Sequence, residues 1–428
     1  MARYPASTDT YIRRFVDTEL DVLFDELPAI LLDGPRAVGK TATAARRCPT
    51  AWYLDDPLAR EALASEPHML ESDRGSVLVD EWQRVPSVWD VVRRVVDERR
   101  RGSQFLLTGS VPPAGVHSGA GRIVTLRMRP MCLAERLSTP STVSIAGLLG
   151  GHPQQIMGTS QMTLGDYVDE IMTSGFPGIR GLGAVARNAA LDGYLDRIVE
   201  HDLGEAGFVV RRPAALRSWM RAYAAATGTS AAWERIRDSA TAGLANKPAK
   251  TTTLNYTELL TEMRVLDPLD AWLPGRNHFA RLASSPKHHI ADPALAVRLL
   301  KCTRAQLLRG EQRGIPVPRD GLLLGNLFES LAALTIRAAA QAARANVAHL
   351  RTRNGDHEVD FIVEGDEGIV AFEVKLSGSV DDHDVRHLLW LRNQIGDDLL
   401  DSVVVTTGPM AYRRQDGVAV VPLALLGA

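Results

Sequence analysis

A phosphate-binding loop pattern near the N-terminus constrains the fold of this chain more than any other feature. The apolar run 29–33 is followed directly by Gly-Pro-Arg-Ala-Val-Gly-Lys-Thr at residues 34–41. A loop of this kind between a strand and a helix brings backbone N–H groups and the positive helix end to the phosphates of a nucleotide. The spacing therefore predicts an α/β nucleotide-binding domain at the start of the chain.

The loop pattern also predicts how a nucleotide is held. We expect Lys40 to neutralise charge on the β- and γ-phosphates, and the Thr41 hydroxyl to bind Mg²⁺. ATP and Mg²⁺ are therefore the expected cofactors. The residues expected to contact ATP in this loop are Gly34, Pro35, Arg36, Ala37, Val38, Gly39, Lys40 and Thr41.

A second apolar run, 77–79, ends in two adjacent carboxylates, Asp80 and Glu81. Open α/β sheets bind ligands at the carboxyl ends of their strands, so both side chains are expected beside the loop. We expect Asp80 to hold Mg²⁺ and Glu81 to polarise the attacking water.

A third apolar run, 105–107, is followed by Thr108-Gly109-Ser110. Thr108 or Ser110 is expected to sense the γ-phosphate or to position water, and ordinary turn chemistry is the alternative interpretation.

These motifs resemble those of the bacterial and archaeal AAA-type ATPases that carry a C-terminal restriction-endonuclease-like domain. In that family an arginine just before the fifth strand reaches the γ-phosphate in a neighbouring subunit. Arg122 resembles it in position, Arg127 and Arg129 are alternatives, and a plain salt bridge is the competing interpretation. An arginine supplied in trans implies a homo-oligomer. The resemblance covers nearly the whole chain and rests on residues 34–41, 79–86, 108–110 and 121–126.

Length and resemblance together predict a chain of several domains. The 428 residues exceed what one hydrophobic core usually organises. The resemblance implies an α/β fold class with four segments: a P-loop AAA-type ATPase core with a parallel sheet and helices on both faces (1–160), a helical lid (161–205), a winged helix-turn-helix module (206–290) and a restriction-endonuclease-like α/β domain (291–428).

The predicted winged-helix segment is the basic part of the chain. Residues 206–290 hold twelve Lys and Arg against six Asp and Glu, although the whole chain has a net charge of −2. We expect this segment to contact the phosphates of duplex DNA, with 251–263 as its recognition helix. The alternative is a solvated helical face that bridges two domains. The arginines expected near one another are Arg211, Arg212, Arg217 and Arg221.

A hairpin is predicted at 358–375, with the turn 365–368 placing Glu364 opposite Ile369. This register sets Asp360 opposite Glu373 and Glu358 opposite Lys375, with all four on one face. Like charges opposite one another destabilise a sheet unless a cation lies between them. The pattern therefore indicates half of a divalent-metal site.

The hairpin resembles the PD-(D/E)xK nuclease superfamily, whose preceding helix also supplies a carboxylate. The resemblance implies that Glu329, Asp360 and Glu373 bind Mg²⁺, while Lys375 positions water and offsets charge on the phosphorane. A structural pair of Glu358 and Lys375 with solvent-facing carboxylates is the alternative. The flanking elements expected are a helix at 322–344, a strand near 347–352, a helix at 382–395 and a strand at 402–406.

Two functions fit these patterns. The first is an ATP-hydrolysing, DNA-processing protein with metal-dependent nuclease activity. The second is a nucleotide-gated regulatory or defence or stress protein whose C-terminal domain binds nucleic acid or protein without cleaving it. A small-molecule kinase is disfavoured by the paired carboxylates and by the lack of an acceptor-binding module. No run approaches a membrane span, and charged residues in 1–20 argue against a signal peptide, so a cytoplasmic protein without membrane contact is expected.

Overall fold

The computed structural model groups the chain into two compact units. One unit comprises Met1–Arg129 and Glu262–Arg264, and the other comprises Pro130–Thr261 and Val265–Ala428. The first unit ends earlier than the predicted domain boundary at residue 160, and the finer four-part division stays a prediction. The structure describes residues 11–72, 75–99, 101–109, 120–137, 140–151, 154–205, 208, 210, 212–240, 250–272, 285–309, 311–312, 315–316, 321–352 and 355–428.

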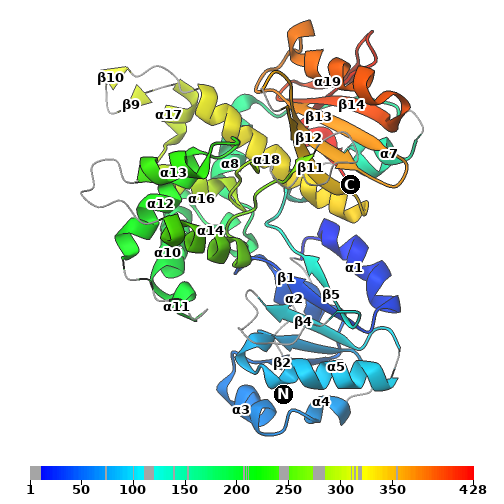
Figure 1. Cartoon of the computed structure of the whole chain (residues 1–428), viewed down its shortest axis with the longest axis vertical. Coiled ribbons are helices and arrows are strands. Elements are labelled where there is room, and N and C mark those ends of the chain that lie inside the picture. Colours follow the sequence, from blue (N-terminus) through cyan, green and yellow to red (C-terminus); the bar gives the residue numbers. More distant parts are fainter. Residues whose placement is uncertain are drawn as a thin grey trace. The chain divides into compact units, whose positions relative to one another are not determined.

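A five-stranded parallel sheet forms the centre of the N-terminal unit, with strand order β2-β3-β4-β1-β5 (Figure 1). Every residue of β1, β3 and β4 is buried, as in a parallel sheet covered on both faces. Because all neighbours run in the same direction, the carboxyl ends of β1, β3 and β4 meet at one edge. The strands are β1 (Ala29–Asp33), β2 (Thr50–Tyr53), β3 (Val77–Asp80), β4 (Phe105–Gly109) and β5 (Ile123–Arg127).

Helix packing completes this unit. In α5, valines at helical spacing, such as Val88, Val92 and Val95, join the apolar side chains of β3 and β4 in one core. Trp82 and Trp89 extend this core, with ring centroids 4.5 Å apart. The helices are α1 (Phe15–Glu26), α2 (Lys40–Ala45), α3 (Pro57–Ser65), α4 (Met69–Ser72), the 3₁₀-helix η1 (Trp82–Arg84) and α5 (Ser87–Arg99).

The C-terminal unit is built on an eight-stranded mixed sheet, with strand order β7-β15-β16-β14-β13-β12-β11-β8. Figure 1 labels its strands β11 to β14. Strands β13, β14 and β16 are parallel, whereas β11, β12 and β13 form an antiparallel meander. The strands are β7 (Gly158–Thr159), β8 (Ala271–Trp272), β11 (Asn346–Arg351), β12 (Glu358–Glu364), β13 (Ile369–Val374), β14 (Leu399–Thr406), β15 (Met410–Arg413) and β16 (Ala419–Pro422), with short pairs β6 (Val143–Ser144) with β17 (Leu426–Gly427) and β9 (Glu311–Gln312) with β10 (Ile315–Pro316).

The predicted hairpin register is confirmed from Glu364 opposite Ile369 to Phe361 opposite Phe372. The simple alternation of faces is wrong beyond that point, because the pairing of β12 with β11 shifts by one residue between the pairs Ile362–Ala348 and Val359–Leu350. This bulge turns Val359 to the same core cluster as Ile362. The irregularity falls at Asp360, one of the predicted metal ligands.

Helices cover both faces of the sheet around the hairpin. Helix α19 (Asp382–Ile395) packs Val385, Leu388 and Leu391 into a core with β12 and β13. Helix α18 (Gly321–Ala342) packs on β11 and on helices α6 (Leu133–Arg136), α7 (Ile145–Leu149) and α8 (Leu164–Thr173). The prediction of these helices and of the strands that follow them is confirmed.

Among the described residues, one helix is long and apolar enough to cross a membrane, the stretch Leu322–Ala342 of α18. Its most apolar window is 67% buried inside the protein. Because α18 packs on a strand and three helices of its own unit, we treat it as a core helix.

The middle of the chain is helical. Helix α14 (Lys250–Glu262) agrees with the predicted recognition helix. After it come β8 and two antiparallel bridges, Leu266 with Ile290 and Leu269 with Lys287. The winged-helix assignment stays a prediction. The other helices are α9 (Pro177–Arg180), α10 (Ala184–Arg197), the π-helix η2 (Ile198–Asp202), α11 (Leu203–Glu205), α12 (Pro213–Ala225), α13 (Trp233–Ala240), α16 (Pro293–Leu300), α17 (Arg304–Arg309) and the 3₁₀-helices η3 (Gly396–Asp398) and η4 (Leu423–Leu425).

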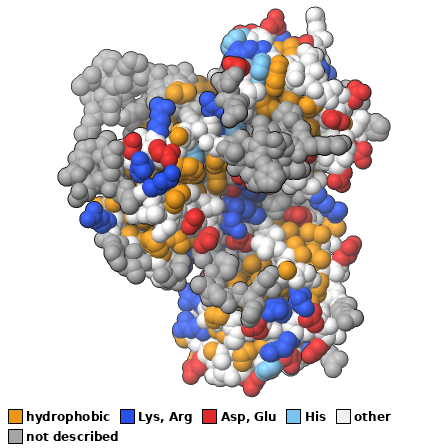
Figure 2. Space-filling view, viewed as in Figure 1, with side chains coloured by type: hydrophobic (Ala, Val, Ile, Leu, Met, Phe, Trp, Pro, Cys, Tyr) orange, Lys and Arg blue, Asp and Glu red, His pale blue; other side chains and the backbone are white. Residues whose placement is uncertain are grey.

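Two of the arginines expected near one another, Arg217 and Arg221, lie one turn apart on α12. Arg217 forms an ion pair with Asp196, and Arg221 donates to the carbonyl of Leu299. Both arginines therefore have structural partners in their own unit, while Arg211 lies outside the described residues. On the face drawn in Figure 2, acidic and basic side chains lie interspersed with apolar ones.

Candidate functional site

The predicted phosphate loop joins β1 to α2 in the N-terminal unit. Ala37 and Gly39 adopt positive φ values of 61° and 105°. At Gly34, a Cβ atom would lie 2.2 Å from the carbonyl oxygen of Met128, which no larger residue tolerates. The loop therefore takes a tight left-handed course at the carboxyl edge of the sheet, as the pattern predicts.

The Lys40 side chain turns back over this loop. Its Nζ donates to the carbonyl oxygens of Gly34 and Pro35, over 2.8 and 3.0 Å. Burial lowers the pKa of Lys40 to about 8, although nearby carboxylates, first of all Glu81, act in the opposite direction. Lys40 is thus a largely desolvated ammonium held inside the loop, where it is able to meet phosphate charge.

Asp80 links the loop helix to two strands. Its Oδ1 accepts a hydrogen bond from Thr41 Oγ1 over 2.7 Å and a second from Thr108 Oγ1. Burial raises the pKa of Asp80, and the two hydroxyl donors oppose that shift. The hydroxyl of Thr41 and the carboxylate of Asp80 are hard oxygen donors, so this pair fits the Mg²⁺ that the loop pattern implies.

Glu81 follows at the end of β3 with its backbone at φ 55°, a left-handed conformation that costs free energy for a residue with a Cβ. Its backbone N–H donates to Thr108 Oγ1 over 3.3 Å, and its Oε2 accepts from Gln83 Nε2 over 2.6 Å. The turn thus directs Glu81 away from the course of β3, and Gln83 fixes its carboxylate.

Two arginines support the loop, and the sequence analysis missed both. Arg14 is 5% exposed, and its guanidinium donates to the carbonyl oxygens of Val38 (3.2 Å) and Arg129 (2.7 Å). Arg264, grouped with this unit, donates to Asp33 at the end of β1 over 2.6 Å. Neither arginine belongs to a recognisable motif, because each reaches the loop from a distant part of the sequence.

The predicted arginine finger lies elsewhere in the unit. Arg122 precedes β5, whose first residue pairs with Ala29 at the start of β1, and its Nε donates to Asp97 over 2.8 Å. Arg122 is therefore at the sheet edge opposite the loop, in the plain salt bridge that was the competing interpretation. Arg127, one of the alternatives, pairs in register with Asp33 at the loop edge of the sheet. Its position therefore suits an arginine finger better than that of Arg122. Ser110 lies outside the described residues.

Two of the three carboxylates predicted to bind metal in the C-terminal unit, Asp360 and Glu329, converge on a lysine. Lys287 Nζ lies 2.7 Å from Asp360 Oδ1, 2.8 Å from Glu329 Oε1 and 3.7 Å from Glu358 Oε1. Lys287 is 1% exposed. These carboxylates do not fit a divalent cation, because Lys287 already supplies the positive charge between them.

The protonation of this cluster reflects burial and its two lysines. Burial acts to raise the pKa of Asp360, but the Lys287 ammonium outweighs it and holds this pKa below the usual value. Burial raises the pKa of Glu329 to about 8 against the effect of Lys287. Burial and the charge of Asp360 raise the pKa of Glu373 to about 8. The cluster therefore retains a proton at neutral pH.

Lys375, predicted to position the attacking water, pairs with Glu373 over 2.8 Å. Asp360 Oδ2 accepts from the backbone N–H of Val374 over 2.8 Å, so the bulged strand aims this carboxylate at both the lysine and β13. The predicted Glu329, Asp360, Glu373 and Lys375 thus come together. Lys287 is the member that the sequence analysis missed, since it lies in the segment interpreted only as basic.

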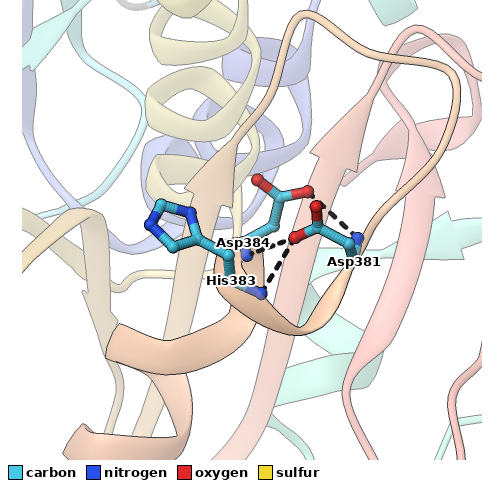
Figure 3. A group of neighbouring side chains, drawn as sticks. All are labelled: Asp381, His383 and Asp384. Atoms are coloured by element: carbon cyan, nitrogen blue, oxygen red, sulfur yellow. Dashed lines mark hydrogen bonds between the residues drawn. The ribbon is translucent and has the colours of Figure 1, made fainter.

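An exposed group of metal-ligating residue types, Asp381, His383 and Asp384, lies at the start of α19 (Figure 3). Asp381 Oδ1 accepts from the backbone N–H of His383 and of Asp384, and Asp384 accepts from that of Asp381. These bonds make Asp381 and Asp384 a helix cap, to which His383 contributes its backbone N–H.

Comparison with family models divides the chain in three. Residues 26–137 match an AAA domain (AAA_14). This segment is therefore similar to AAA domains. Residues 164–306 and 324–426 match two domains of unknown function, DUF8612 and DUF4143. The AAA domain contains the loop and both Asp80 and Glu81.

Relatives cover most of the chain. Two proteins described as uncharacterized, from Mycobacterium tuberculosis and Mycobacterium bovis, are each 28% identical over 376 residues, which is 85% of this chain and 74% of theirs. Among solved structures, a Walker-type ATPase of Pyrococcus abyssi is 17% identical, with TM-score 0.41 over 70% of this chain and 99% of its own. The ORC2 protein of Aeropyrum pernix is 15% identical, with TM-score 0.28 over 74% of this chain and 92% of its own.

Proposed function

We propose that the AAA domain binds ATP with Mg²⁺ and hydrolyses it to ADP and phosphate. The observation that carries the proposal is the hydrogen bond of Thr41 to Asp80, which joins the loop helix to the acidic end of β3. It unites two motifs 39 positions apart at the edge where parallel sheets bind ligands.

Each residue then has a defined part. Lys40 offsets charge on the β- and γ-phosphates, and Thr41 and Asp80 hold Mg²⁺, which neutralises further phosphate charge. Glu81 orients water and takes its proton as the water oxygen bonds to the γ-phosphorus and the bond to ADP breaks. Gln83 keeps the Glu81 carboxylate in place for that transfer.

Phosphate release and nucleotide binding, measured on the full chain, test these parts separately. Glu81→Gln is expected to keep binding a fluorescent ATP analogue while hydrolysis falls by about 10²- to 10⁴-fold. Lys40→Ala is expected to weaken binding by at least about 30-fold. Glu98→Gln, which changes an exposed glutamate on α5, is the matched control. Parental hydrolysis by Glu81→Gln would remove Glu81 from the mechanism.

For the C-terminal unit, we favour the interpretation that it binds nucleic acid or protein under nucleotide control without cleaving. The position of Lys287 between Asp360 and Glu329 supports this choice, because metal-dependent cleavage needs a divalent cation among these carboxylates. DNA remains the proposed ligand because residues 206–290 carry an excess of positive charge. A homo-oligomer with an arginine supplied in trans remains a prediction.

Incubation with labelled linear, nicked and branched DNA, with and without ATP and Mg²⁺, separates the two functions. We expect ATP-dependent changes in binding and no cleavage in any lane. Cleavage by the parent that Lys375→Ala abolishes would instead establish the nuclease. If no DNA is bound, the DNA assignment fails and the ATPase assignment stands.

A further inference from the structure

In the C-terminal unit, the carboxylates of Asp360 and Glu329 surround a positive charge, as carboxylates do in a metal site. The positive charge here is the ammonium of Lys287. Asp360 and Glu329 come from different elements, β12 and α18, yet each has an oxygen within 2.8 Å of one atom, Lys287 Nζ. Oxygen ligands from separate elements usually converge in this way on a cation. Here that cation belongs to the chain.

The backbone of Lys287 is bonded on both sides of the residue, so the point from which its side chain extends is fixed. Its N–H donates to the carbonyl of Leu269, and its carbonyl accepts from the N–H of Leu269, both over 2.8 Å. The next residue, His288, donates to the carbonyl of Thr229 over 2.8 Å. The main chain at Lys287 is therefore held in place, and the contacts of Nζ with Asp360 and Glu329 hold the side chain in the cluster.

The surroundings leave the ammonium dependent on the carboxylates. Lys287 Nζ lies 6.0 Å from the centre of the Phe361 ring, and the His289 ring stacks on the same phenyl group. Lys287 is 1% exposed, so water cannot replace its carboxylate partners. A buried ammonium and buried carboxylates each need the other, since an isolated buried charge is strongly unfavourable.

We propose that Lys287 is the resident cation of this cluster, in place of a metal, and that its removal exposes a divalent-cation site formed by Asp360 and Glu329. The parent protein therefore has no metal site that depends on Asp360. In the wild-type protein, the Lys287 ammonium stabilises the fold by compensating the buried carboxylates. The same ammonium excludes a metal ion from the cluster. This inference does not depend on ATP hydrolysis in the other unit.

Mn²⁺ binding to the full chain without nucleotide tests the proposal, with free Mn²⁺ measured by electron paramagnetic resonance. We expect Asp360→Asn in the parent to leave Mn²⁺ binding unchanged. Lys287→Ala should gain about one Mn²⁺ per chain, because carboxylate oxygens suit this ion. The double variant Lys287→Ala/Asp360→Asn should lose that gain, and Lys250→Ala, which removes an exposed lysine, should gain none.

Two results would overturn the proposal. One is Mn²⁺ binding by the parent that Asp360→Asn abolishes, which would mean that metal and lysine coexist. The other is folded Lys287→Ala that gains no Mn²⁺. If the alanine variant does not fold, Lys287→Met replaces it, because methionine keeps the apolar stem of the lysine. The Tm of Lys287→Met is expected to rise when Mn²⁺ is added, whereas the Tm of the parent is not. The comparison of the parent with Asp360→Asn needs no lysine variant.

Discussion

Thr41 Oγ1 donates to Asp80 Oδ1 over 2.7 Å, so the first turn of α2 is joined to the end of β3. Asp80 is 6% exposed, and a buried carboxylate that loses a donor is costly. We expect Thr41→Val to destabilise the N-terminal unit by about 1–3 kcal/mol, because Thr108 alone then serves Asp80. Denaturant unfolding without nucleotide measures this change.

The same variant is expected to lose Mg²⁺-dependent phosphate release, since its hydroxyl is a proposed metal ligand. Thr41→Ser keeps the hydroxyl and removes only the methyl group, so it is the matched control. Unchanged hydrolysis by Thr41→Val would show that the hydroxyl serves only the fold.

Arg14 is expected to set the shape of the phosphate loop from outside it. Arg14→Met keeps the apolar stem but leaves the carbonyls of Val38 and Arg129 without a donor, at a cost of about 1–3 kcal/mol. We expect ATP affinity to fall as the loop loosens, by roughly 10-fold if about 1.4 kcal/mol of that cost appears in binding. Arg13→Met is the control, because Arg13 pairs with Asp21 on the surface. Equal effects of both variants would contradict this role.

The sequence predicted those parts of the fold and the site that are determined by residues close together in the chain. Residues 34–41 encode the loop, and the run 77–79 with its two carboxylates encodes the other half of the site, because strand ends in a parallel sheet meet at one edge. The turn 365–368 likewise predicted the hairpin register, because a short turn between two strands fixes which residues face one another.

The sequence did not predict contacts between distant residues. Arg14 reaches Val38 across 24 positions, and Lys287 reaches Asp360 across 73. No periodicity marks either residue, because its role depends on how separate elements pack. The bulge at Asp360 was missed because alternation assumes a regular ladder, and one extra residue reverses the face of Val359.

His349 is expected to make the C-terminal unit acid-sensitive. Burial, aided by the charge of Lys287, lowers the pKa of His349 to about 4, below its usual 6.5. The unfolded state then binds a proton that the folded state rejects, so stability present above pH 6.5 is lost as pH falls toward 4. The full loss attributable to this residue is about 3 kcal/mol.

Hydrogen exchange of the β12 and β13 amides between pH 7.5 and 4.5, corrected for the intrinsic exchange rates, reports this loss. His349→Gln should flatten part of the pH dependence, and His383→Gln, an exposed histidine on α19, should not. Identical pH profiles for the parent and His349→Gln would mean that other groups carry the effect.

Arg122→Ala tests whether this arginine acts beyond its surface pair. The Arg122 and Asp97 side chains are 37% and 53% exposed, so losing the pair should cost less than about 1 kcal/mol. We expect hydrolysis to stay near the parental rate. Loss of more than about 10³-fold, the lower range for an arginine finger, together with oligomers in sedimentation analysis, would support action in trans.

Lys287→Met should destabilise the C-terminal unit by roughly 3–5 kcal/mol at pH 8, because the carboxylates of Asp360 and Glu329 stay buried without their cation. In the parent, Lys287 holds the pKa of Asp360 below its usual value, and without the ammonium burial should raise this pKa instead. For a carboxyl with a raised folded pKa, the penalty is full above that pKa and disappears as pH falls toward the unfolded value. Urea unfolding at pH 8 and pH 5.5 should therefore show a smaller difference between variant and parent at pH 5.5, whereas a difference that grows on acidification would mean that Lys287 does not neutralise these carboxylates.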